Sequence, residues 1–71
     1  MQITELITSS PDTLGGTPVF AGTRVPVRNL TDYLEAGDSL DEFLADFPSV
    51  SRQQAVSVLE RAKEALLASF A

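Results

Sequence analysis

Ile3, Glu5 and Ile7 alternate with Thr4, Leu6 and Thr8, and the β-branched side chains in this run predict a short strand. A Ser-Ser-Pro-Asp turn at residues 9–12 ends it. A second β-prone region follows, in which residues 18–21 and residues 24–27 flank a Gly-Thr pair. A glycine in this place is typical of a tight hairpin, because it adopts positive φ without a steric penalty. The N-terminal third is therefore expected to hold a strand and a β-hairpin.

Two short amphipathic helices are expected next. Pro26 fixes φ for a helix start, and Gly37 stands where a glycine commonly ends a helix. The apolar positions between them have i, i+3, i+4 spacing and are Leu30, Tyr33 and Leu34. Ser39 and Glu42 have the spacing of a capping box, and Pro48 ends the helix that this box begins.

A third, longer helix is expected from Arg52 to about Phe70, with Ser51 and Gln54 in a second capping box. Its apolar stripe comprises Ala55, Leu59, Ala62, Leu66 and Phe70. A helix of about 19 residues is about 28 Å long, which two short helices cannot cover. We expect its end, with Leu66, Leu67 and Phe70, to meet another chain; the alternative is a frayed terminus.

These elements predict a mainly α fold with a short N-terminal β element, in which a strand and a β-hairpin precede a three-helix bundle of helix-turn-helix type. We expect one domain over residues 1–71, with the strand and hairpin in 1–27 and a three-helix bundle in 28–71. A chain of 7.6 kDa exposes about 4,300 Å² when folded and about 11,000 Å² when extended, so folding hides only about 61% of its surface. With no cysteine for a disulfide, such a small domain is expected to need a partner chain.

The residue types leave little room for catalysis. The chain has no histidine or cysteine, which removes the commonest zinc ligands and the most frequent general base. Asp38, Asp41 and Glu42 could hold magnesium or share a proton, but a solvated helix start stabilised by the helix dipole is the favoured interpretation. We therefore expect no enzyme, no metal and no cofactor.

The sequence also argues against a membrane location. No apolar run approaches the roughly 20 residues that span a bilayer. The N-terminus lacks the basic start and apolar stretch of a signal peptide. We expect a cytoplasmic protein with no membrane contact.

Charge is unevenly distributed along the chain. Between Thr13 and Thr31 there is no acid, whereas Arg24 and Arg28 lie inside, so this stretch carries +2 and the remainder carries −7 of the net −5. The two arginines could contact DNA phosphates from a wing-like hairpin. The alternative is an ion pair with one of the chain's own carboxylates.

A helix-turn-helix motif presents the first residues of its second helix to the major groove, and here these are Ser51, Arg52, Gln53 and Gln54. Arginine and glutamine match the edges of guanine and adenine. The alternative is a solvated helix start in which Ser51 and Gln54 cap backbone amides. The preceding helix would repel phosphate through its acids, which are Asp41, Glu42 and Asp46.

One long segment resembles a known family. Residues 15–51 read GGTPVFAGTRVPVRNLTDYLEAGDSLDEFLADFPSVS, with an isoleucine run and a Ser-Pro-Asp turn ahead of them. The "GGxPxxxGTR" and "SxxExxxxFP" patterns are similar to those of the bacterial and archaeal family registered as domain of unknown function number 433, over about Ile3 to Leu66. The resemblance implies a winged-helix-like or three-helix domain that forms homodimers. It also implies an antitoxin of a type II toxin-antitoxin pair, which neutralises a PIN-like ribonuclease and represses its own operon. Arg24 and Arg28 could then enter the acidic site of that ribonuclease instead of contacting DNA.

The resemblance and the patterns together give two sets of candidate residues. The partner or dimer interface is expected to comprise Val19, Phe20, Gly22, Thr23, Leu66, Leu67 and Phe70. Operator DNA is expected to meet Arg24, Arg28, Ser51, Arg52, Gln53 and Gln54. The chain stops soon after Leu66, so inhibition is expected to use the folded body or the last helix. The alternative function is a stand-alone DNA-binding regulator with no toxin partner.

Overall fold

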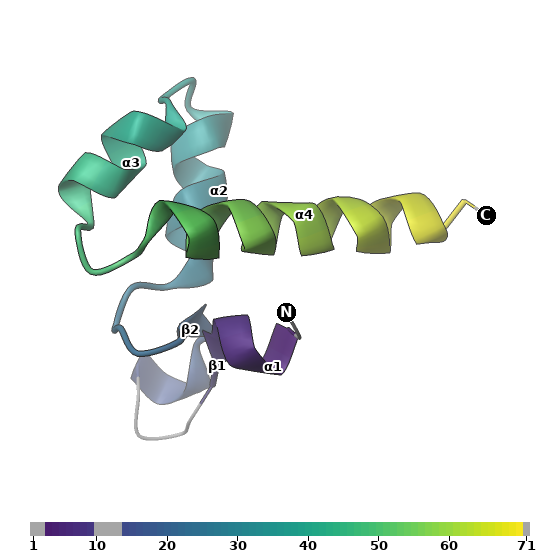
Figure 1. The fold of residues 1–71 in the computed structure, drawn as a ribbon, viewed down its shortest axis with the longest axis horizontal. Helices are drawn as coiled ribbons and strands as arrows, with labels where there is room; N and C mark the ends of the chain where they lie inside the picture. Colours follow the sequence, from purple (N-terminus) through teal and green to yellow (C-terminus); the bar gives the residue numbers. More distant parts are fainter. Residues whose placement is uncertain (1–2, 10–13, 71) are drawn as a thin grey trace.

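A computed structural model describes residues 3–9 and 14–70 of the chain (Figure 1). In chain order its elements are α1 (Ile3–Leu6), β1 (Ile7–Thr8), the 3-10 turn η1 (Leu14–Gly16), β2 (Val19–Phe20), α2 (Val27–Glu35), α3 (Leu40–Asp46) and α4 (Arg52–Ala68). The predicted fold class, mainly α with a short N-terminal β element and three main helices, is confirmed. The turn predicted at residues 9–12 lies, from residue 10 on, outside the described residues.

The predicted strand over residues 3–8 is wrong over its first four residues, where the chain forms the helical turn α1; only Ile7–Thr8 is extended. The side chain of Leu6, at the end of this turn, is buried in the core. Its carbonyl oxygen accepts a hydrogen bond from the backbone N–H of Ala21, at 2.8 Å. Figure 1 shows α1 running beside α4. These tertiary contacts override the β-propensity of the sequence.

The predicted hairpin forms its turn but only part of its ladder. Gly22 adopts φ +78°, as expected, and the Thr23 hydroxyl donates to the carbonyl of Phe20 at 2.8 Å. Residues 24–27 do not form a regular strand; they make a single bridge, from Val19 to Pro26. Proline has no N–H to extend a ladder. The regular antiparallel partner of β2 is instead β1, with Ile7 opposite Phe20.

Helix α2 ends as the sequence predicts. Gly37 adopts φ +92°, and its N–H donates to the carbonyl of Leu34 at 3.1 Å. The N–H of Asp38 donates to the carbonyl of Tyr33 at 2.9 Å. These two bonds form a Schellman motif, which satisfies the last carbonyls of the helix and turns the chain toward α3.

Helix α3 begins with the predicted capping box. The Ser39 hydroxyl accepts from the Glu42 N–H at 3.1 Å, and the Glu42 carboxylate accepts from the Ser39 N–H at 3.0 Å. The helix ends at Asp46, two residues before Pro48. This box fixes the direction of α3, whose Phe43 is fully buried.

The core is centred on Phe43. Its ring contacts the rings of Phe20, Tyr33 and Phe47, with centroid distances of 6.0, 5.5 and 5.0 Å. The buried residues of this core are Leu6, Phe20, Leu30, Phe43, Val50, Ala55 and Val58. Every described element from α1 to α4, apart from η1, therefore contributes at least one residue to or beside one core.

Helix α4 is buried only at its N-terminal part, where Ala55 and Val58 enter the core. It ends at Ala68, two residues before the predicted end. Figure 1 shows its C-terminal part extending alone beyond the other elements. The two short helices do not reach it, as their lengths lead one to expect.

Candidate interaction surfaces

The residues predicted to read DNA bases lie together at the start of α4, but most of them are engaged within the chain. The side-chain amide of Gln54 donates to the backbone carbonyls of Ala21, at 3.0 Å, and Leu6, at 3.3 Å. Gln54 therefore does not complete a capping box. It fixes α4 to the end of α1 and to the turn after β2, a structural role that the sequence analysis did not assign.

Two of the other candidate residues, Ser51 and Arg52, are also bonded within the chain. The Ser51 hydroxyl accepts the N–H of Gln54 at 3.0 Å and so caps α4. The guanidinium of Arg52 forms an ion pair and hydrogen bond with Asp41, on the preceding helix. Of the four candidates, only Gln53 is exposed with no hydrogen bond or ion pair recorded in the described part of the chain.

The two arginines of the acid-free stretch differ in their ion pairing. Arg28 lies on the first turn of α2 and pairs with Asp32 one turn later, at 3.9 Å. Both side chains are well exposed, so this i, i+4 pair contributes little to stability. Arg24 is exposed in the turn before α2 and makes no ion pair with any residue of ranges 3–9 and 14–70.

Two of the predicted interface residues lie inside the chain's own core. Val19 and Phe20 are 2% and 0% exposed, because β2 is the inner strand, between β1 and the bridge to Pro26. Their side chains cannot reach a partner while this fold is intact. Gly22 is exposed at the tip of the turn, and the hydroxyl of Thr23 closes that turn by accepting the N–H of Val25.

The other predicted interface residues form an exposed apolar ridge. Leu66, Leu67 and Phe70 are 63%, 61% and 84% exposed at the C-terminal end of α4. Leu66 and Phe70 are four residues apart, so they lie one turn above the other on the same side of the helix path. We call these three residues the ridge.

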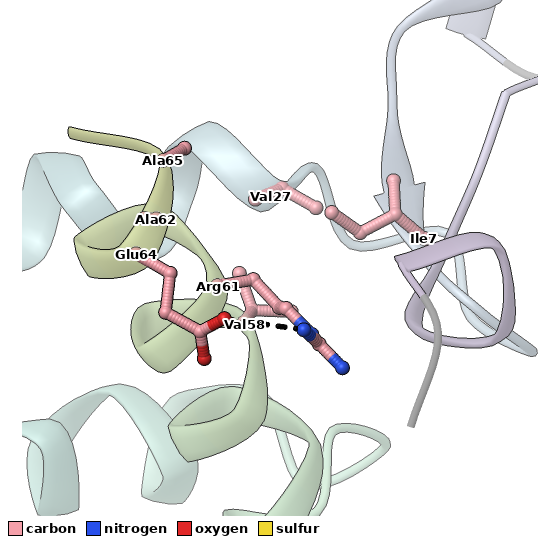
Figure 2. Close-up of a pocket in the computed structure, with 7 residues that line it drawn as sticks. All are labelled: Ile7, Val27, Val58, Arg61, Ala62, Glu64 and Ala65. Atoms are coloured by element: carbon pink, nitrogen blue, oxygen red, sulfur yellow. Dashed lines mark hydrogen bonds and ion pairs between the residues drawn. The ribbon is translucent and has the colours of Figure 1, made fainter. Parts of the chain in front are cut away.

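An open apolar groove of about 620 Å³ lies beside the ridge. Figure 2 shows α4 on one side of it and Val27 and Ile7 on the other. The wall from α4 consists of Val58, Ala62 and Ala65, with Arg61 and Glu64, which form an ion pair at 3.3 Å, at its edge. The i, i+4, i+7 spacing of the three small residues was visible in the sequence, but the facing residues come from β1 and α2, which only the fold brings close.

A third surface is acidic. Six of the ten acids fall between residues 29 and 51, where there is no lysine or arginine, and all six are exposed: Asp32, Glu35, Asp38, Asp41, Glu42 and Asp46. We call these residues the acidic face. The hydroxyl of Tyr33 donates to Asp46 at 2.6 Å. That hydrogen bond, together with partial burial and the nearby charges of Asp46, Asp38 and Glu42, raises the pKa of Tyr33 above 10.0.

Within the part of the chain that the structure describes, no three acidic side chains come close enough to hold a metal ion. No helix there is both long enough and apolar enough to span a bilayer. What the described residues offer is therefore three surfaces: the ridge, the groove and the acidic face.

Comparison with known sequences places this fold in a family. The family model described as a protein of unknown function (DUF433) matches residues 7–62. The chain belongs to the DUF433 family. It is 48% identical, over 50 residues, to the uncharacterized protein y4eO of Sinorhizobium fredii, and the match covers 70% of this chain but only 23% of that protein.

A solved structure supports the same fold. The crystal structure of a DUF433 member from Anabaena variabilis matches this chain with a TM-score of 0.72. The match covers 87% of this chain and 61% of that one, at 24% sequence identity. The arrangement of helices described above is thus shared by another DUF433 protein.

Proposed function

We propose that this DUF433 chain is the antitoxin-like component of a type II toxin-antitoxin pair, a homodimer that neutralises a PIN-like ribonuclease by binding it directly. The observation that carries the proposal is the uncovered ridge on α4, whose three large apolar residues are exposed. They belong to the end of α4, which extends beyond the other elements (Figure 1). Small domains bury such side chains in their own core or against another protein. A chain built in this way acts through protein contacts.

The acidic face favours a basic protein as the second partner. Glu35 and Asp38 form no ion pair with any described residue. Arg28 and Arg52 pair with Asp32 and Asp41, but the six acids outnumber these two bases and produce a negative field over α2 and α3. A ribonuclease binds the phosphates of RNA through basic groups. An acidic surface would be attracted to those groups and would exclude RNA from them.

Repression of the operon is the second part of the proposal. Arg24 and Gln53 are exposed, and a homodimer would present both of them twice. A stand-alone DNA-binding regulator has weaker support, because Arg28 and Arg52 are paired with acids and Gln54 is bonded to the backbone. We therefore propose that DNA is bound by the complex with the toxin rather than by this chain alone.

Co-expression with the product of the adjacent gene tests the toxin partner. We expect the two proteins to co-purify and the ribonuclease activity to be suppressed. Glu35→Lys should weaken the complex about tenfold or more, since it reverses a charge on the acidic face. Glu5→Lys makes the same change on α1, outside that face, and should leave the affinity unchanged.

Two results would reject parts of the proposal. If no small nuclease is encoded nearby and no complex forms, the toxin partner is wrong. If the chain alone binds its upstream DNA with an affinity that falls steeply with salt, the stand-alone regulator is the better description.

A further inference from the structure

We infer that the groove beside α4 receives the ridge of a second copy of this chain, so that two copies exchange ridge and groove around a two-fold axis. This deepens the proposed function: it assigns the apolar surfaces to the homodimer and leaves the acidic face to the ribonuclease. The inference itself rests on the shape, area and charge of the α4 region.

The ridge and the groove are complementary in size. The α4 wall of the groove is made of Val58, Ala62 and Ala65, which leave space beside the helix, whereas the ridge is made of two leucines and a phenylalanine. No described segment of the chain fills the groove (Figure 2). Large side chains inserted between small ones on a facing helix are the usual form of close helix packing.

The placement of the two surfaces favours a second copy over a different protein. Consecutive residues of a helix are about 100° apart, so around α4 Leu66 lies about 80–100° and Phe70 about 120–140° from Val58 and Ala65, whereas Leu67 lies about 160–180° from them. The edge of the ridge formed by Leu66 thus adjoins the groove on one helix. A two-fold axis near this helix lets each copy insert its ridge while its groove is filled, which closes the assembly at two chains.

The exposed area of the chain also favours a second copy as the occupant of the groove. The chain exposes 4780 Å², roughly 500 Å² more than the value of about 4,300 Å² expected for a monomer of its mass. Its radius of gyration is 12.3 Å, against about 11 Å for a compact chain of this length. A standard interface takes about 800 Å² from each partner, so the excess area equals more than half of one partner's share.

The charge pattern points in the same direction. Two copies of a chain with net charge −5 repel each other over most of their surfaces. The groove end of α4 is different, because Glu60 pairs with Lys63 and Glu64 pairs with Arg61, so this turn is neutral. A basic nuclease gains no electrostatic attraction there, whereas a second copy meets its least repulsive approach.

Sedimentation of the full chain tests the inference. We expect a dimer at micromolar concentration. Leu66→Glu, in the ridge, and Ala65→Phe, which fills the groove, should each raise the dimer dissociation constant about tenfold or more. Val56→Glu is the matched control, because Val56 is an exposed apolar residue of α4 that does not line the groove and lies about three helical turns from the ridge, and it should keep the dimer.

A mixture of the two variants separates this arrangement from other apolar contacts. The Leu66→Glu chain keeps its groove and the Ala65→Phe chain keeps its ridge, so one of the two contacts can form between them. We expect a heterodimer at concentrations where neither variant associates alone. Circular dichroism and thermal unfolding of each variant check that the monomers remain folded.

A monomeric unmodified chain would overturn the inference, and so would a dimer that both variants leave intact. Loss of nuclease binding by Glu35→Lys in a chain that still dimerises supports the division of surfaces. If Leu66→Glu abolishes nuclease capture and leaves the dimer unchanged, the ridge binds the toxin and the inference is wrong. If the dimer behaves as expected and no nuclease is bound, the inference stands and the proposed function fails.

Discussion

The side-chain amide of Gln54 donates a hydrogen bond to the carbonyl of Ala21, across a sequence separation of 33 residues. Its second bond, to Leu6, means that one side chain in the first turn of α4 holds both the end of α1 and the turn after β2. Gln54 therefore links α4 to the N-terminal part of the fold through two side-chain hydrogen bonds. This role leaves it unsuited to reading a base.

Gln54→Ala should destabilise the fold by about 1–2 kcal/mol, because two partly buried carbonyls lose a donor and only one of them keeps a second donor, the N–H of Ala21 on Leu6. Chemical denaturation measures the change. Gln53→Ala alters the adjacent, exposed glutamine and should change the free energy of unfolding by less than about 0.5 kcal/mol. Equal effects of the two substitutions would show that the bonds of Gln54 contribute nothing.

Local signals predicted the helices well, and long-range contacts explain where prediction failed. Gly37 and the Ser39–Glu42 box act within one or two turns, so their spacing alone located the junction of α2 and α3. The helical turn at Ile3–Leu6 depends on α4, far along the chain, and no pattern in residues 3–8 encodes that contact. The burial of Val19 and Phe20 likewise follows from pairing with β1.

Among the candidate surfaces, too, some follow from local sequence and others depend on the fold. The ridge was predictable, because an apolar stripe on a helix too long for its neighbours must remain uncovered in part. The groove was not, since Ile7 and Val27 reach it only through the fold. The base-reading set stays a prediction. A glutamine at a helix start has the same sequence signature whether it faces DNA or its own backbone, and the side chain of Gln54 bonds to the backbone.

Phe43→Ala should unfold the protein or destabilise it by about 3–5 kcal/mol, since Phe43 is fully buried and its ring contacts three other aromatic rings. Phe70→Ala removes the same side chain from the exposed ridge. It should leave the melting temperature of the monomer unchanged at low concentration while weakening the dimer. A large loss of monomer stability from Phe70→Ala would mean that the ridge packs within its own chain.

Gly22→Ala should destabilise the turn by about 1–2 kcal/mol, because φ at this position is +78° and an L-residue with a Cβ is strained there. An added Cβ would meet no heavy atom within 4 Å, so the effect is conformational and not steric. Gly22→Asn should be milder, since asparagine tolerates this region better. Equilibrium unfolding of the two variants measures the difference, and equal losses would contradict the conformational origin.

The last prediction concerns Tyr33, which is the only tyrosine in a chain with no tryptophan, so its phenolate absorbance can be followed alone. We expect its titration midpoint in the folded protein to lie above 10.0, because its hydroxyl donates to Asp46 and three carboxylates disfavour the phenolate, which raises the pKa. Asp46→Ala should lower the midpoint, whereas Glu35→Gln, which removes an acid that does not act on Tyr33, should leave it in place.

Because the pKa of Tyr33 is higher in the folded chain than in the unfolded one, the stabilisation from this group is complete below pH 10.0 and is lost as the pH rises through the folded pKa. The stability difference between the unmodified chain and Tyr33→Phe should therefore shrink at strongly alkaline pH, and a difference that stays constant there would contradict the role of the Tyr33–Asp46 bond.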